Sequence, residues 1–228
     1  MRIPATDRSW ALPLFLTDEN KARWSVGAAI LAAFLYLTSN HLHLSPPQYL
    51  PFTWIDESAP FIPWSVWIYI SEYVYFIFVY FAIRDNVTLN KYIYSITSLQ
   101  VVSVAIFWLW PTTYPRMNFP IGPEVDWMTR LTFEILRTAD TPANCCPSLH
   151  VSSVYLSSLV LLDDEEPGKF RAFFIWGTLI AMSTLTTKQH YFVDVVAGLL
   201  MAVTCYWLVH RMARYRPLEE TAIGRALA

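Results

Sequence analysis

The chain has 228 residues, of which 55% are hydrophobic and only 15% are charged, against roughly 25% charged residues in typical soluble domains. Its net charge of −2 leaves no basic field for a nucleic acid, and three cysteines exclude a disulfide framework. The six glycines form neither a phosphate-binding loop nor a dinucleotide fingerprint. Composition therefore favours a membrane protein over a disordered or soluble one.

The N-terminal segment, residues 1–23, mixes basic and acidic side chains and lacks the long apolar core of a cleavable signal peptide. We therefore expect the first apolar run, which begins at Trp24, to remain as a membrane anchor. On this basis the chain divides into a cytoplasmic segment 1–23, a membrane domain 24–212 and a cytoplasmic tail 213–228.

Apolar runs along the chain predict an all-α bundle of six membrane-spanning helices, because a helix needs roughly 17–25 mostly apolar residues to cross about 30 Å of hydrocarbon. The fourth run is short, and it counts as a span because a polar stop follows it. The fifth requires Arg171 to extend its charge to the interface. The six runs cover residues 24–43, 64–83, 92–110, 147–162, 170–187 and 192–212.

Lysine and arginine residues are shared unequally between the two sides of this bundle. Twelve of the sixteen fall in the N-terminal segment, in the loops 84–91 and 163–171, and in the tail. The positive-inside rule then predicts cytoplasmic termini. The small size favours a bacterial inner membrane. The four cations left on the outer side are Arg116, Arg130, Arg137 and Lys188.

A further helix is predicted at residues 123–137, within the long outer loop 111–147. Trp127, Leu131 and Leu136 lie roughly on one side of it. This pattern fits an amphipathic helix at the membrane interface, and it fits an ordinary packed loop helix equally well.

Ionisable side chains near membrane depth are costly and indicate function by default. Most of the candidates fall at the predicted outer ends of the fourth, fifth and sixth spans. Glu72, in the second span, has either a structural or a functional role, and the loop residues Asp56 and Glu57 are expected to be solvated. The candidates are Glu72, His150, Lys188, His190 and Asp194.

His190 and Asp194 are four residues apart at the start of a predicted helix, so they share a face. A carboxylate beside an imidazole selects one tautomer and prepares the other ring nitrogen as a nucleophile or base. A structural pair that caps the helix is the alternative.

Ser148 and His150 follow Pro147 at the start of another predicted helix. The free N–H groups and the dipole of a helix N-terminus attract anions, and the hydroxyl of Ser148 adds a donor. His150 can carry a proton, while Arg116 and Lys188 supply permanent charge for phosphate oxygens.

Phosphoryl transfer uses such a set, because it needs donors for the phosphate oxygens, a nucleophile in line and an acid for the leaving oxygen. We expect His190 to attack phosphorus, Asp194 to orient it and His150 to protonate the leaving group. We expect Arg116, Lys188 and Ser148 to bind the phosphate. No metal ion and no other cofactor is expected. The expected partners are a membrane lipid substrate and the bilayer, and no nucleic acid.

At these positions the sequence resembles the type 2 phosphatidic acid phosphatase superfamily, whose signature blocks are Lys-x6-Arg-Pro, Pro-Ser-Gly-His and Ser-Arg-x5-His-x3-Asp. The second block reads Pro-Ser-Leu-His at 147–150, and the third ends in His190-Tyr-Phe-Val-Asp194. The resemblance covers about residues 50–205. It implies a six-helix membrane bundle with its site at the outer leaflet.

Other positions depart from those blocks. The first block survives as Arg116, with Leu109 in place of its lysine and Met117 in place of its proline. Thr184 replaces the arginine of the third block, and Lys188 is its candidate substitute. The forms Pro-Ser-Leu-His and His-Tyr-x-x-Asp of the second and third blocks resemble the inositol phosphorylceramide synthase branch, a relative of sphingomyelin synthases.

Two reactions fit this resemblance. If water accepts the phosphoryl group the chain is a lipid phosphatase, which its small size and short loops favour. If a lipid alcohol accepts it, the chain is a phosphotransferase, which the motif variants favour.

A small membrane transporter remains the alternative of another class. A zinc site at Cys145, Cys146 and His150 is disfavoured because adjacent cysteines do not readily point at one tetrahedral ion and other ligands are missing.

Overall fold

The computed structural model describes residues 11–140, 143–163 and 166–220, and this part of the chain is mostly helical. Parts of four predicted segments lie outside the described residues: 1–10 of the N-terminal segment, 141–142 of the long outer loop, 164–165 of the polar stop and 221–228 of the tail.

Long helices form the body of the molecule, and short ones flank them. The helices are α1 (Lys21–His41), α2 (Trp54–Ser58), α3 (Val66–Ile70), α4 (Glu72–Ala82), α5 (Asn86–Leu109), α6 (Trp127–Ala139), α7 (Leu149–Val160), α8 (Pro167–Thr186) and α9 (Phe192–Cys205). The π-helical segment η4 (Tyr206–Met212) continues α9. Single turns of 3-10 helix are η1 (Pro63–Ser65), η2 (Arg116–Asn118), η3 (Leu161–Asp163) and η5 (Leu218–Glu220).

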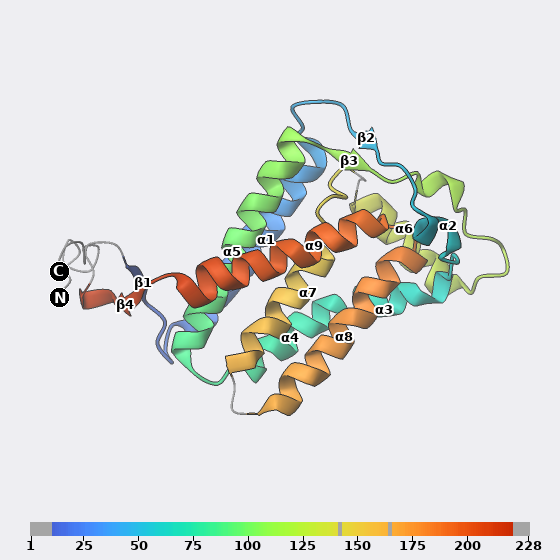
Figure 1. Ribbon diagram of the computed structural model, residues 1–228. Helices are drawn as coiled ribbons and strands as arrows, with labels where there is room; N and C mark the ends of the chain where they lie inside the picture. The colour runs from blue at the N-terminus through green and yellow to red at the C-terminus, as the bar shows by residue number, and fades with distance from the viewer. Residues whose placement is uncertain (1–10, 141–142, 164–165, 221–228) are drawn as a thin grey trace.

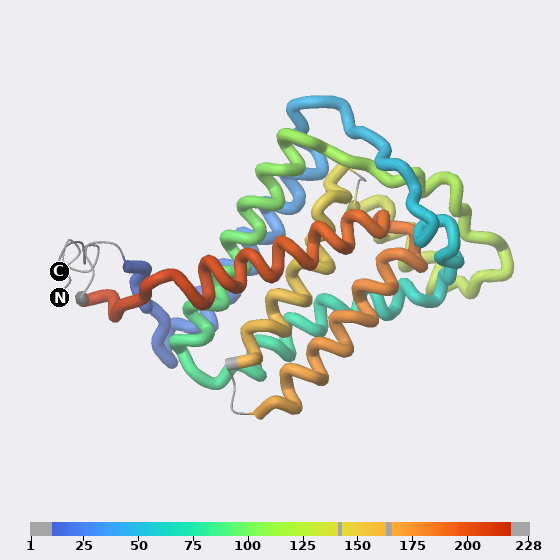
Figure 2. Tube along the Cα trace, viewed as in Figure 1, coloured from blue at the N-terminus to red at the C-terminus, as the bar shows by residue number. Residues whose placement is uncertain are grey.

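Short parallel strand pairs close the two ends of the bundle. The strand β1 (Leu12–Leu14) pairs with β4 (Tyr215–Pro217), and β2 (Gln48–Tyr49) pairs with β3 (Thr112–Thr113). The first pair lies at one end of the bundle, while α2, α6 and the second pair lie at the opposite end (Figures 1 and 2). The long helices run between these ends.

Four helical segments among the described residues are long and apolar enough to cross a membrane. They are Lys21–His41, Pro63–Ala82, Asn86–Leu109 and Phe192–Met212, and each overlaps a predicted span. The helix α7 is apolar but shorter.

The second predicted span is interrupted at Ser71, where α3 ends and α4 begins. The hydroxyl of Ser71 donates to the carbonyl of Ile68 at 2.6 Å and accepts from the indole of Trp176 at 2.9 Å. A serine that bonds back to the preceding turn competes with the helical ladder. The interruption leaves Glu72 as the first residue of α4.

The helix α7 is the centre of the bundle, because ten of its twelve residues are buried. It packs against α4, α5, α8 and α9. Its serines face tyrosines of neighbouring helices: the hydroxyl of Tyr75 lies 2.8 Å from Ser158, and that of Tyr92 lies 2.9 Å from Ser157. Side-chain bonds of this kind hold helices together where apolar burial alone provides little specificity.

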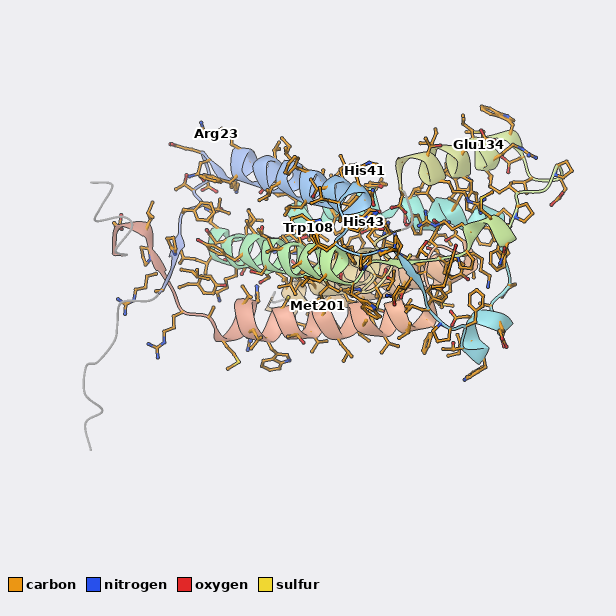
Figure 3. All side chains as sticks on the ribbon, turned by 90° about the horizontal axis from the view of Figure 1, so that it is seen from above. Arg23, His41, His43, Trp108, Glu134 and Met201 are labelled. Atoms are coloured by element: carbon orange, nitrogen blue, oxygen red, sulfur yellow. The ribbon has the colours of Figure 1, made fainter. Side chains whose placement is uncertain are left out.

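The helix α1 lies at the edge of the bundle, beside α5, and only two of its 21 residues are buried. Figure 3 shows it as an outer layer that runs from Arg23 to His41. Its contacts with the rest of the fold are polar at one end, where Asn40 accepts from the amide of Asn144 at 2.7 Å.

Candidate active site

The loop between α8 and α9 carries His190, and the first turn of α9 carries Asp194. The ring nitrogen Nδ1 of His190 lies 3.3 Å from Asp194 Oδ2 and 3.0 Å from the backbone carbonyl of Cys145. A carbonyl oxygen only accepts hydrogen bonds, so the proton of the neutral ring sits on Nδ1. The nitrogen Nε2 therefore keeps its lone pair, as a nucleophile requires.

Asp194 has a second task, because its Oδ2 also accepts from the backbone N–H of Tyr191 at 2.9 Å. Its side chain is fully buried, and Oδ1 has no hydrogen-bond partner among the described residues. The predicted spacing thus brings His190 and Asp194 into contact. The geometry is compatible with both interpretations of the pair, because the same carboxylate caps the start of α9 and contacts the ring of His190.

His150 lies in the first turn of α7, and the centroid of its ring is 5.8 Å from that of His190. The acid Glu72, at the start of α4, has its Oε2 3.3 Å from Nε2 of His150. The ring of Tyr69 packs against His150 with centroids 4.4 Å apart. The predicted acid and the predicted nucleophile are therefore neighbours.

Ser148 is the N-cap of α7: its hydroxyl oxygen accepts from the N–H of Val151 at 3.4 Å. Its own backbone N–H donates to the carbonyl of Asp194 at 3.1 Å, which ties the starts of α7 and α9 together. Gly198 permits this approach, because a Cβ there would lie 2.7 Å from the carbonyl oxygen of Ser148. The absence of a side chain at Gly198 thus allows the start of α7, which carries His150, to lie close to α9, which follows His190.

Arg116 is buried and forms an ion pair with Asp140, at 2.8 Å between Nη2 and Oδ2. Its Nη1 donates to the backbone carbonyl of Asp140 at 2.7 Å, and Nε has no partner among the described residues. Tyr36 of α1 donates to the other carboxylate oxygen of Asp140. Burial and the charge of Asp194 raise the pKa of the Cys145 thiol, which Arg116 opposes, so Arg116 lies within electrostatic reach of the site.

Lys188 lies at a different place from the two histidines. Its Nζ donates to the backbone carbonyls of Asp56 at 2.9 Å and Ala59 at 2.6 Å. Its backbone has φ of 57°, in the left-handed region that a residue with a side chain rarely occupies. Burial lowers the pKa of its amine. Lys188 therefore holds α2 against the loop before α9.

Asp56 was expected to be solvated, and this expectation is wrong. The side chain is 4% exposed, and its Oδ1 accepts from the backbone N–H of Phe192 at 2.7 Å, at the start of α9. Its Oδ2 accepts from Thr53 within the cap of α2. An acidic residue 136 positions away in the chain thus satisfies a free donor of α9.

The contact between Glu72 and His150 could not be predicted from the sequence. An acid at membrane depth was the available signal, but nothing in the spacing of positions 72 and 150 indicates a contact between two separate helices.

Cys145, His190 and Asp194 form the one group of three metal-ligating side chains among the described residues, with ligand atoms within 4.8 Å of one another. The group fits a metal poorly. His190 Nδ1 already faces two oxygen acceptors, and burial raises the pKa of the Cys145 thiol, whereas the thiolate is the form that binds metals.

The fold and this cluster define a helical protein with membrane-spanning character that brings two imidazoles, one carboxylate and the N-terminus of a helix close together. A family model of the PAP2 superfamily matches residues 33–208, and the chain belongs to that superfamily. Its members generally have phosphatase or phosphotransferase activity. A search among curated proteins gives no match.

Proposed function

We propose that this protein cleaves a lipid phosphate ester or diphosphate at the outer face of a membrane, through a phosphohistidine on His190. The observation that carries the proposal is the 5.8 Å separation of the two rings, combined with the Nδ1 contacts that leave Nε2 of His190 free to attack.

In the first step, the lone pair of His190 Nε2 forms a bond to phosphorus as the bond between phosphorus and the lipid oxygen breaks. Protonated His150 gives its proton to that oxygen, so the lipid leaves as a neutral alcohol. The charge that develops on His190 is stabilised by Asp194.

In the second step, an oxygen of water attacks phosphorus and its proton returns to His150. The bond between phosphorus and nitrogen breaks, and its electron pair returns to His190. Inorganic phosphate leaves and both rings are restored. The cycle needs no metal ion, because protons and charge are handled by the two histidines, Asp194 and the phosphate-binding groups.

The phosphate oxygens would be bound by the N-terminus of α7, the hydroxyl of Ser148 and Arg116. Because the Ser148 oxygen accepts from Val151, its O–H is available to donate. Lys188 can join them only by exchanging its two carbonyl partners, so we assign the primary contacts to the other three groups.

The proposed membrane arrangement has six spans: the four long apolar segments together with α7 and α8. Because α7 is enclosed by other helices, its short length does not expose backbone groups to lipid. Both termini would be cytoplasmic and the histidines extracytoplasmic, in a bacterial inner membrane. The exposed Trp127, Leu131 and Ile135 of α6 support a position of that helix in the interface.

A second candidate is transfer of the phospho-head group to a lipid alcohol, as in the inositol phosphorylceramide synthase branch. Leu149 within the second block favours it. Incubation with a phospholipid donor and ceramide or diacylglycerol, followed by lipid mass spectrometry, separates the two: a new phospholipid indicates transfer, and free phosphate indicates hydrolysis.

The test uses the full chain purified in detergent, with EDTA and phosphatidic acid labelled with ³²P. We expect phosphate release and an acid-labile, alkali-stable label on the protein. His190→Gln should lower turnover by about 10³-fold or more and abolish the label, while His41→Gln, at an exposed histidine of α1, should leave both unchanged.

Full activity in His190→Gln would contradict the proposed nucleophile. Activity that disappears with EDTA and returns with zinc or magnesium would contradict the metal-free cycle. Movement of unaltered labelled lipid across liposomes would instead identify a transporter.

A further inference from the structure

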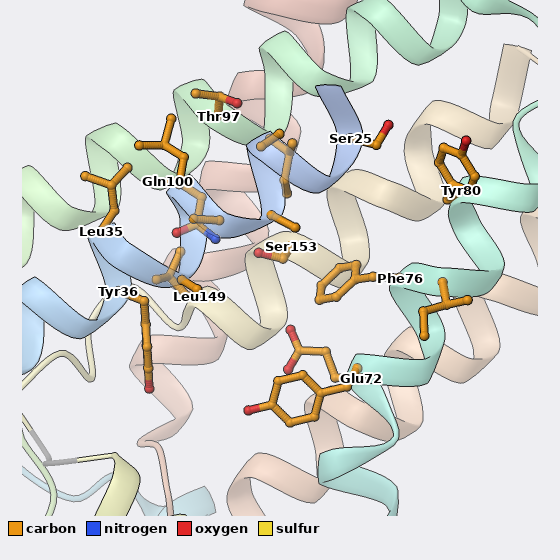
Figure 4. Close-up of a pocket in the computed structure, with 18 of the residues that line it drawn as sticks. Ser25, Leu35, Tyr36, Glu72, Phe76, Tyr80, Thr97, Gln100, Leu149 and Ser153 are labelled. Atoms are coloured by element: carbon orange, nitrogen blue, oxygen red, sulfur yellow. The ribbon is translucent and has the colours of Figure 1, made fainter. Parts of the chain in front are cut away.

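A cavity of about 820 Å³ lies between α1, α4, α5 and α7. Figure 4 shows side chains of these helices that surround it. One end is polar and includes Glu72 and His150, and the remainder is almost wholly apolar. We call this space the chamber. Its volume falls within the range of about 300–1,000 Å³ that ligand sites commonly have.

The chamber meets the candidate active site from one side only. His150, Glu72 and Asp140 line it, whereas His190 and Ser148 are not among the described residues that do. A molecule in the chamber therefore approaches the proposed acid, and the proposed nucleophile lies beyond it. In the cycle above, the atom that meets the acid is the oxygen of the leaving alcohol.

The walls of the chamber suit a hydrocarbon chain. Its lining on α1 extends from Ala22 to Leu37, a length of about 22 Å at 1.5 Å per residue, which exceeds the roughly 15 Å of one leaflet's hydrocarbon. Five alanines of α1 line it and leave room for a ligand. At its rim, Val26 and Ile77 are more than half exposed, so lipid can enter from the side.

A polar group interrupts the apolar wall near the acid. The side-chain oxygen of Gln100 is buried and has no hydrogen-bond partner among the described residues. Figure 4 shows its amide directed toward Ser153, between α1 and α7. A buried amide oxygen without a partner costs free energy, and a ligand with a hydrogen-bond donor next to its reacting oxygen would remove that cost.

We propose that the chamber binds the alcohol portion of the substrate, a long-chain lipid alcohol with an amide or hydroxyl group beside the reacting oxygen, and that Gln100 recognises that group. This inference rests on the proposed function for the role of His150. The bond that breaks joins phosphorus to the oxygen held at the chamber end, and that oxygen takes the proton of His150 as described above.

The first test narrows the chamber. Ala32→Phe fills it from α1, and Ile30→Phe is the matched control, because Ile30 is 65% exposed and does not line the chamber. We expect Ala32→Phe to lower kcat/KM for dioleoyl phosphatidic acid at least tenfold and to change hydrolysis of p-nitrophenyl phosphate less than twofold. An equal loss on both substrates, or no loss on the lipid, would overturn the proposal.

The second test needs no turnover. A diacylglycerol with a diazirine in its acyl chain is photolysed with the protein, and the crosslinks are mapped by mass spectrometry. We expect crosslinks on α1 and α4 that Ala32→Phe reduces and Ile30→Phe retains. Crosslinks elsewhere overturn the chamber even in an active enzyme. Crosslinks in the chamber of a protein without activity support it while refuting the proposed function.

The third test concerns Gln100. We expect Gln100→Leu to lower kcat/KM about fivefold for lysophosphatidic acid, the size of one ordinary hydrogen bond, and to leave hexadecyl phosphate, which lacks the hydroxyl group, within twofold. Equal effects on the two substrates would show that Gln100 has only a structural role.

Discussion

The helices α1 and α7 are both apolar, yet they occupy opposite environments. Ten of the twelve residues of α7 are buried, against two of 21 in α1. Hydroxyl groups of α4, α5 and α8 bond to side chains of α7, while α1 is attached mainly along α5 and at its polar end. The proposed chemistry needs both environments. The buried helix α7 holds His150 in place, and the exposed helix α1 forms one side of the chamber that would bind lipid.

The largest expected effect concerns the attachment of α1. Asp140→Asn removes the partner of buried Arg116 and weakens the bond from Tyr36. An uncompensated buried charge costs about 3–5 kcal/mol, so we expect a strong loss of thermal stability in detergent. Tyr36→Phe removes one hydrogen bond and should cost about 1 kcal/mol. Equal losses in both variants would show that the ion pair contributes little.

The next prediction compares Gly198 of α9, which packs against the start of α7, with Gly27 of the exposed helix α1. A Cβ at Gly198 would lie 2.7 Å from the Ser148 carbonyl oxygen, whereas a Cβ at Gly27 of α1 meets no atom within 4 Å. We expect Gly198→Ala to destabilise the protein by about 1–3 kcal/mol and to reduce activity by moving the start of α7. Gly27→Ala should stabilise α1 by as much as about 1 kcal/mol. Differential scanning fluorimetry and phosphate release measure both.

A smaller effect is expected for the acid beside His150. Glu72→Gln keeps the shape of the side chain but removes the carboxyl group whose Oε2 lies 3.3 Å from Nε2 of His150. Because an ionised carboxyl group at this place would stabilise the protonated ring that the proposed cycle requires, we expect kcat to fall about tenfold with little change in KM. The control is Glu57→Gln, at an exposed position of α2. An unchanged pH profile of kcat in Glu72→Gln would contradict a role through His150.

The smallest effect concerns the backbone of Lys188, which has φ of 57°. Lys188→Ala and Lys188→Gly both remove the amine that holds Asp56 and Ala59. The left-handed conformation costs roughly 1–2 kcal/mol in a residue with a Cβ, so the glycine variant should be about 1 kcal/mol more stable than the alanine variant. Thermal denaturation of the two compares them directly.

Local patterns predicted those parts of the site that depend on neighbours along the chain. The spacing of His190 and Asp194 implies their contact, and Ser148 before a helix implies its capping bond, because helical geometry determines both. The long apolar runs likewise predict the helices. The start of α6, predicted at 123 and observed at Trp127, is four residues in error because Asp126 caps the helix by accepting from the N–H of Thr129.

Contacts between distant segments escaped prediction. Glu72 beside His150, Asp140 beside Arg116 and Asp56 at the start of α9 each join residues whose proximity arises only when helices pack. The chamber is a still stronger case, because its volume depends on small side chains of α1 facing α4 and α5 at once. The hydrophobic periodicity of one helix does not predict how much volume remains between that helix and the helices that face it.

The exposure of α1 has a practical consequence for any preparation of this protein. Because α1 alone covers this side of the chamber, the rim of the chamber contacts the lipid or detergent that surrounds the protein. A detergent tail has the same chemistry as the ligand we propose and is present in large excess, so we expect it to act as a competitive inhibitor. Apparent KM values should therefore rise with detergent concentration and fall on transfer to nanodiscs.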